Sequence, residues 1–154
     1  MNIIKATLEH KTPALTLLDE FRTNVMRQEN PQSTVVSTDA MEKGSAVYAE
    51  VVQSNDGAIF LAQDGNEFVG IITIYRFPRV RAGTYYAEIE EMFVRPEYHG
   101  KGVAQELVQA ATTWAKENGA ETITTKSGEK LARAHAFYEK IGFRVYGKAF
   151  KKLL

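Results

Sequence analysis

The residues whose types and spacing could do chemistry lie in one stretch of the chain. Residues 88–94 (EIEEMFV) combine glutamates with a β-type apolar run, and residues 99–104 (HGKGVA) follow after a short turn. Two glycines flank Lys101 where a helical pattern begins. The first turn of a helix attracts anions through its free N–H groups and its dipole, and glycines let a phosphate approach the backbone. The stretch predicts an anion site, although an ordinary tight turn has the same composition.

Two nucleotide-binding fingerprints do not fit this turn. A Walker motif needs GxxxxGK followed by Ser or Thr, and no such sequence is present. The dinucleotide fingerprint GxGxxG fails because Gln105 occupies the third glycine position and no βαβ unit precedes it. An NTP-binding domain stays an alternative, which predicts thermal stabilisation by ATP.

Composition narrows the function classes. A length of 154 residues predicts a single domain spanning 1–154, and equal numbers of basic and acidic residues (19 each) argue against a nucleic-acid partner. Zero cysteines exclude disulfides, thiolate metal sites and a cysteine nucleophile. His10, His99 and His135 lack ligand-like spacing, so we expect no metal. Without a basic-then-apolar leader or an apolar run of roughly 18 residues, we expect no secretory signal, no membrane partner and a cytoplasmic protein.

Hydrophobic periodicity and turn residues predict the elements that position this stretch. The predicted order is strand 2–6, a helix beginning near residue 12, a polar connection at 28–37, a helix from 38 or 39 to 53, strands 58–63 and 67–75, a loop at 76–83, strand 85–94, helix 102–118, strand 121–125, helix 129–140, and strands 143–146 and 149–153. The consecutive strands predict an antiparallel meander, and the later strand–helix–strand order predicts a parallel crossover. The predicted fold is an α/β (α+β) layer architecture around one mixed sheet, with the order β-α-α-β-β-β-α-β-α-β-β.

Two segments resemble the GNAT superfamily of N-acetyltransferases. The family's acetyl-CoA motif has Gln or Arg, two variable residues, Gly, one variable residue, then Gly or Ala. Residues 99–104 match it except that His99 stands in the Gln/Arg position. Residues 134–143 (AHAFYEKIGF) match the family's A-x-x-F-Y-x-x-x-G-F segment, with Leu131 where many members carry Asn. The resemblance covers nearly the whole chain.

The resemblance implies a mixed, mainly antiparallel sheet flanked by helices and an acyltransferase. Such an enzyme moves acetyl from acetyl-CoA to a primary amine of a small molecule or protein. The central strand splays at a bulge, so that its backbone binds the pantetheine arm, and the helix start binds the pyrophosphate. A homodimer is a further family-based expectation. The implied cofactor-binding residues are Met92, Phe93, Val94, His99, Gly100, Lys101, Gly102, Val103, Ala104, Gln105 and Tyr138.

Three residues are candidates for catalysis. By resemblance, Tyr138 is the general acid, whose phenol with a pKa of about 10 can protonate a departing thiolate. It could also be a core aromatic residue. Either Glu90 or Glu91 could be the base, because a bulge would change which of them shares a face with the reacting groups. A solvated acidic strand that only attracts a cationic amine is the alternative.

Two function classes stay open. An N-acetyltransferase predicts thiol release from acetyl-CoA with some amine acceptor. A noncatalytic acyl-CoA-binding or regulatory module predicts cofactor binding without turnover. The acidic residues near Glu90 favour cationic amines slightly, but nothing in the sequence names the acceptor.

Overall fold

One mixed sheet forms the centre of the fold. The structure is a computed structural model that describes all residues, 1–154. Its strands follow one another across the sheet in sequence order, antiparallel up to β4, with β4 and β5 parallel. The strands are β1 (Asn2–Lys5), β2 (Gly57–Asp64), β3 (Glu67–Arg79), β4 (Thr84–Val94) and β5 (Ala120–Thr125). This sheet confirms the predicted mixed α/β fold class.

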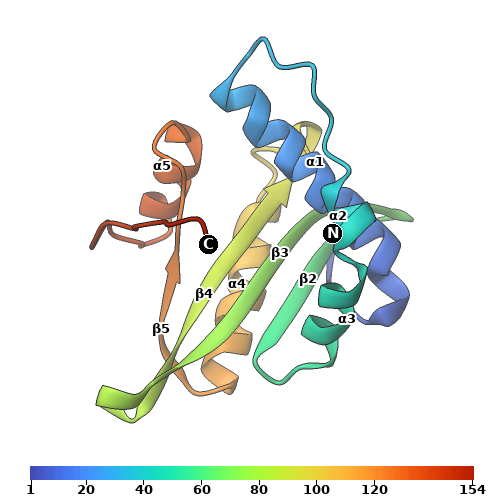
Figure 1. The fold of residues 1–154 in the computed structure, drawn as a ribbon. Coiled ribbons are helices and arrows are strands. Elements are labelled where there is room, and N and C mark those ends of the chain that lie inside the picture. The colour runs from blue at the N-terminus through green and yellow to red at the C-terminus, as the bar shows by residue number, and fades with distance from the viewer.

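Helices cover both faces of this sheet. Helices α1, α2 and α3 lie over one face, α4 lies over the other, and α5 follows the end of β5 (Figure 1). No helix is long and apolar enough to span a bilayer. The helices are α1 (Lys11–Glu29), α2 (Asp39–Lys43), α3 (Ser45–Gln53), α4 (Val103–Glu117) and α5 (Ala132–Lys140), and short 3-10 turns lie at Leu8–His10, Val80–Ala82 and Pro96–Tyr98.

Alternating side chains of the central strands fill two separate cores. On β2, Phe60 faces α4, while Ile59 and Leu61 face α1 and α3. On β3, Ile72 faces α4, while Ile71 faces α1 and α3. Because successive side chains of a strand point to opposite faces, a strand buried on both sides becomes an apolar run. This explains the continuous AIFLA and GIITI sequences.

A bulge in β4 is the feature that shapes the site. The β3–β4 register pairs Thr73 with Glu91 and Ile74 with Ile89, so Glu90 is the extra residue. Strand β5 pairs with β4 only as far as Ile89. Residues 91–94 therefore pair with β3 on one side and with no strand on the other, as β4 continues past the end of β5 (Figure 1).

The two closing strands predicted at 143–146 and 149–153 are wrong. No helix or strand follows α5, and the outer edge of β5 is unpaired. Phe143 packs on the core, but the apolar side chains after it are exposed, with Phe150 94% exposed. A strand pair gains little stability without a sheet or core to pack on, so β-type alternation alone does not fix a strand here.

The loop predicted at residues 76–83 is shorter in the structure, so that prediction is wrong in part. Strand β3 continues to Arg79, and Pro78 pairs with Tyr85. Its pairing with β2 ends at Tyr75, so the last residues of β3 form an edge. Proline is tolerated at an edge because its missing N–H faces no neighbouring strand. The single helix predicted from residue 38 or 39 is instead two short helices that meet at Gly44.

Candidate active site

The glycine turn presents free backbone amides in an open space. Gly100 and Gly102 have left-handed φ values of 77° and 84°, and no other atom lies within 4 Å of the place a Cβ would take at either. The N–H of Glu106 donates to the carbonyl of Gly102 at 3.1 Å. The preceding N–H groups, on residues 103–105, have no acceptor within the helix. This arrangement suits an anion at the start of α4.

Two side chains of the turn are engaged within the protein. The Nε2 atom of His99 lies 2.7 Å from the carbonyl oxygen of Val94. Because a carbonyl oxygen only accepts, Nε2 carries the proton and His99 ties the turn to the end of β4. The ammonium of Lys101 lies 4.8 Å from the ring centroid of Tyr98. These side chains shape the turn, and the amides remain its anion-binding groups.

The unpaired edge of β4 supplies backbone groups beside this turn. The N–H of Arg95 donates to Val69 on β3 at 2.9 Å. In an antiparallel pair, successive residues alternate between bonding that neighbour and facing away from it. By this alternation Phe93 faces β3, whereas Met92 and Val94 direct their N–H and C=O groups to the open edge. The Val94 carbonyl is taken by His99, which leaves Met92 as the residue with both groups available.

The bulge separates the roles of the two glutamates. Glu91 and Phe93 lie on the face covered by α1, while Met92 lies on the α4 face. Glu91 is half-buried, its carboxylate accepts a hydrogen bond from the hydroxyl of Thr73, and its own N–H donates to that oxygen at 3.0 Å. Glu90 is exposed.

The environment of Glu91 changes its acidity. Burial raises the pKa of Glu91, and the hydrogen bond from Thr73 partly opposes this effect. A carboxylate with a raised pKa is a stronger proton acceptor, so this environment suits a general base. Of the two candidate bases, Glu91 is the one that lines a pocket, whereas Glu90 is exposed.

Tyr138 reaches the same part of β4 from the other side. Its ring packs between Phe137 and Phe143, with centroid distances of 5.4 and 5.3 Å, and its hydroxyl lies 3.9 Å from the sulfur of Met92. Burial raises the pKa of Tyr138, and a hydrogen bond with Thr125 partly lowers it. The aromatic neighbours hold the ring while the hydroxyl is directed at Met92. The ring packs as a core aromatic residue does. The hydroxyl lies close enough to β4 to be considered as the general acid.

A pocket of about 510 Å³ opens beside Glu91, between α1, α2, α3 and strands β2 to β4. The sequence did not identify the residue that shapes its rim. Asp19 is buried in α1 and accepts hydrogen bonds from the hydroxyl of Ser37 and from the N–H groups of Ala40 and Met41, at 2.9 to 3.0 Å. It fixes the connection between α1 and α2. An acidic residue within the apolar stripe of a helix was the available signal.

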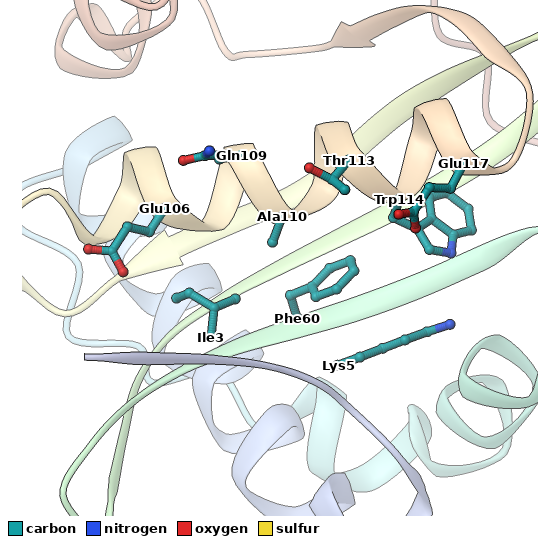
Figure 2. Close-up of a pocket in the computed structure, with 9 residues that line it drawn as sticks. All are labelled: Ile3, Lys5, Phe60, Glu106, Gln109, Ala110, Thr113, Trp114 and Glu117. Atoms are coloured by element: carbon teal, nitrogen blue, oxygen red, sulfur yellow. The ribbon is translucent and has the colours of Figure 1, made fainter.

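A second groove of about 520 Å³ lies elsewhere, between β1 and α4. Figure 2 shows Lys5 on one side of it, Glu106 and Glu117 on the other, and Phe60 between. None of the catalytic candidates lines this groove, whereas Glu91 lines the pocket between α1 and the strands. No group of three or more His, Asp or Glu side chains that could hold a metal ion is present.

Comparison with known proteins identifies the family. The sequence model of the acetyltransferase (GNAT) family matches residues 22–143. The chain belongs to this family. Its membership confirms the resemblance carried by the glycine turn and by residues 134–143, and it agrees with the predicted acyltransferase class.

Relatives of this GNAT chain are N-acetyltransferases by name. The uncharacterized N-acetyltransferase YhfO of Bacillus subtilis is 28% identical over 93 residues, which are 60% of this chain and 62% of YhfO. N-alpha-acetyltransferase 30 of Schizosaccharomyces pombe is 30% identical over 95 residues, 62% of this chain and 63% of that protein. The match thus spans less than two thirds of these relatives' length.

A solved structure shows that the fold is shared over the full chain. The apo structure of an aminoglycoside antibiotic 6'-N-acetyltransferase from Acinetobacter haemolyticus superposes with a TM-score of 0.76 at 18% identity. The superposition covers 100% of this chain and 99% of that one. At this identity the likeness concerns the fold alone.

Proposed function

We propose that this GNAT protein transfers an acetyl group from acetyl-CoA to a primary amine. One observation carries the proposal. The unpaired edge of β4 beyond Ile89 lies between the glycine turn and Tyr138, with Glu91 on the opposite face. Donor-binding backbone groups, a proton acceptor and a proton donor therefore surround the same short piece of strand.

The backbone groups fit the donor. The pyrophosphate of acetyl-CoA would be bound by the N–H groups of residues 103–105, where the glycines leave open space. The pantetheine arm carries amides, and the N–H and C=O groups of Met92 would pair with them as a neighbouring strand does. The thioester supplies an activated acyl group with a thiolate as its leaving group. His99 and Lys101 shape the turn around these contacts.

The side chains supply proton transfer. Glu91 accepts a proton from the attacking ammonium, directly or through water, so that the amine nitrogen has a free lone pair. As the C–N bond forms, the nitrogen releases its second proton to solvent. As the C–S bond breaks, the hydroxyl of Tyr138 donates its proton to the thiolate, and solvent restores it. Glu91 then releases its own proton to solvent. Because the pKa of Tyr138 is raised, this hydroxyl stays protonated at neutral pH and is available as a donor.

The first test is thiol release from acetyl-CoA across a panel of amines. The panel includes small amines, an aminoglycoside and peptides with free N-termini, because the relatives' names cover such acceptors. We expect turnover with at least one amine. We also expect Tyr138→Phe to lower kcat by about 10²-fold or more, the range for loss of a general acid.

Tyr146→Phe is the matched control, since Tyr146 is 85% exposed and far along the C-terminal segment. It should leave kcat unchanged. CoA binding without turnover of any amine, together with no loss in Tyr138→Phe, would support the noncatalytic binding module instead. Stabilisation by ATP but not by CoA would support the NTP-binding alternative.

Two further expectations belong to the same proposal. We infer that two copies of the chain form a homodimer, because the C-terminal segment carries exposed apolar side chains and the outer edge of β5 is unpaired. A cytoplasmic location stays a prediction from the sequence.

A further inference from the structure

The pocket beside Glu91 has features that narrow the class of acceptor. Its volume of about 510 Å³ is in the range of small-molecule sites. Glu91 and Thr73, which lie beside one another on the sheet, provide its polar groups at the strands. Its apolar and aromatic lining includes Leu15, Leu18, Phe21, Tyr48, Val51 and Tyr75.

The acidic groups of the lining are largely engaged with partners inside the protein. Asp19 uses both carboxylate oxygens, since Oδ1 accepts from Ser37 and Ala40 and Oδ2 accepts from Met41. Asp39, on the exposed rim, forms an ion pair with Lys43 at 2.6 Å. Asp19 would have to give up a contact to bind a second ammonium group, and the charge of Asp39 is already balanced by Lys43.

Glu91 differs from these residues. Thr73 donates to its Oε2, and no hydrogen bond engages its Oε1. Among the lining carboxylates away from the exposed rim, Oε1 of Glu91 is therefore the oxygen available for an ammonium, whereas Asp39 lies on the rim and is already paired with Lys43. Arg22 also lines the pocket and forms no ion pair, so its positive charge opposes any further cation.

From this juxtaposition we propose that the acceptor is a primary monoamine with a compact apolar or aromatic body, and not a polyamine or aminoglycoside. The proposal rests on the proposed function. The ammonium pairs with Oε1 of Glu91, and the body of the molecule lies against the aliphatic and aromatic walls. A second ammonium on the same molecule would meet those walls without a partner, which is costly for a charged group.

The test compares acceptors in the thiol-release assay with the full chain. We expect 2-phenylethylamine and hexylamine to have kcat/KM values at least tenfold above those of spermidine, kanamycin and a peptide N-terminus. Within the linear alkylamines, each added methylene that reaches the wall should raise kcat/KM about fourfold. A higher kcat/KM for spermidine, kanamycin or the peptide overturns the assignment of acceptor class and leaves the proposed reaction standing.

A variant pair tests the charge argument without touching the reacting groups. Val47 lines the pocket from α3 and is 57% exposed, so substitution there leaves the core intact. Val47→Asp supplies a second carboxylate at the rim and should raise the spermidine-to-hexylamine ratio of kcat/KM about tenfold. Val47→Asn has the shape of the Val47→Asp substitution without its charge, and it should leave the spermidine-to-hexylamine ratio of kcat/KM unchanged. An equal response of both variants contradicts the charge argument.

Calorimetry with CoA present separates this inference from the proposed function. Binding of 2-phenylethylamine that weakens in Glu91→Gln, with no turnover of any amine, overturns the proposed reaction and supports the pocket assignment. Absence of both binding and turnover for the apolar monoamines overturns the pocket assignment.

Discussion

At the scale of single residues, the two neighbouring glutamates of β4 have different environments. The bulge at Glu90 directs Glu91 to the face where α1 and α3 pack, beside Thr73, and leaves Glu90 in solvent. Sequence reasoning kept both residues as candidates, because strand parity depends on where a bulge falls. Burial, not identity, therefore distinguishes the candidate base from its neighbour.

We expect Glu91→Gln to lower kcat/KM by about 10²- to 10⁴-fold, the usual contribution of a positioned base. The raised pKa of Glu91 also makes the free energy of unfolding depend on pH. The folded state holds the proton more tightly than the unfolded state, so this carboxyl favours folding most below its unfolded pKa. That contribution is lost as pH rises through the folded pKa.

The variant should therefore gain stability relative to the natural chain at neutral pH and lose that advantage below the unfolded pKa. Thermal melts across pH measure the difference, with Glu90→Gln as the matched control. A loss of activity of similar size in Glu90→Gln, or a fall in the melting temperature of Glu91→Gln at pH 7, contradicts the assignment.

Thr73→Val tests the same pair from the other side. The Thr73 hydroxyl bond lowers the pKa of Glu91, so its removal should move the acid limb of the kcat/KM profile to higher pH. The substituted side chain would keep the branched shape of the threonine, but the Glu91 N–H would lose an acceptor, which costs about 1–3 kcal/mol of stability. The pH profile is the deciding measurement, because a purely structural role would leave its midpoint in place.

At the scale of elements, the glycine turn couples the end of β4 to the start of α4. We expect Gly102→Val nearly to abolish CoA binding, since a β-branched residue is strained at a φ of 84° and the turn must rearrange. His99→Ala should weaken CoA binding only a few-fold. Its imidazole bonds the Val94 carbonyl, and the amides that would hold the phosphate belong to the backbone.

Gly65→Val is the control for this comparison. Gly65 also has a left-handed φ, 57°, with no atom within 4 Å of a Cβ, but it lies in the β2–β3 turn. The same strain there should leave CoA titrations unchanged. Equal losses in Gly102→Val and His99→Ala would contradict a site built from backbone amides.

Whether a feature of the fold or site could be predicted from the sequence depends on whether its determinants are local. The glycine turn and Tyr138 carry local motifs, so their positions follow from a few adjacent residues. Asp19 was not predicted because its partners are distant in sequence: Ser37 lies in the α1–α2 connection, and Ala40 and Met41 lie in α2. The closing strands at 143–146 and 149–153 were predicted from alternation alone. Alternation of apolar and polar residues indicates which side chains of a strand would share a face. It does not indicate which neighbouring strand it would pair with.

At the scale of the whole molecule, the sheet and the C-terminal segment each lack a partner. The outer edge of β5 carries unpaired backbone groups, a feature that invites pairing with another chain. The segment after α5 exposes Val145, Tyr146, Phe150 and Leu153, each 85% exposed or more. A monomer gains nothing from this exposure, whereas a second copy could bury both features in one interface.

We therefore expect the full chain to be a dimer in light scattering at micromolar concentration, and Phe150→Asp to shift it towards monomer. Phe150 is 94% exposed, so the substitution disturbs no packing within one copy, while a charge in a buried apolar contact between copies is costly. Val80→Asp is the matched control, because Val80 is 92% exposed on the turn after β3. It should leave the mass unchanged. A monomeric natural chain, or a dimer equally sensitive to both substitutions, would contradict a dimer built on this segment.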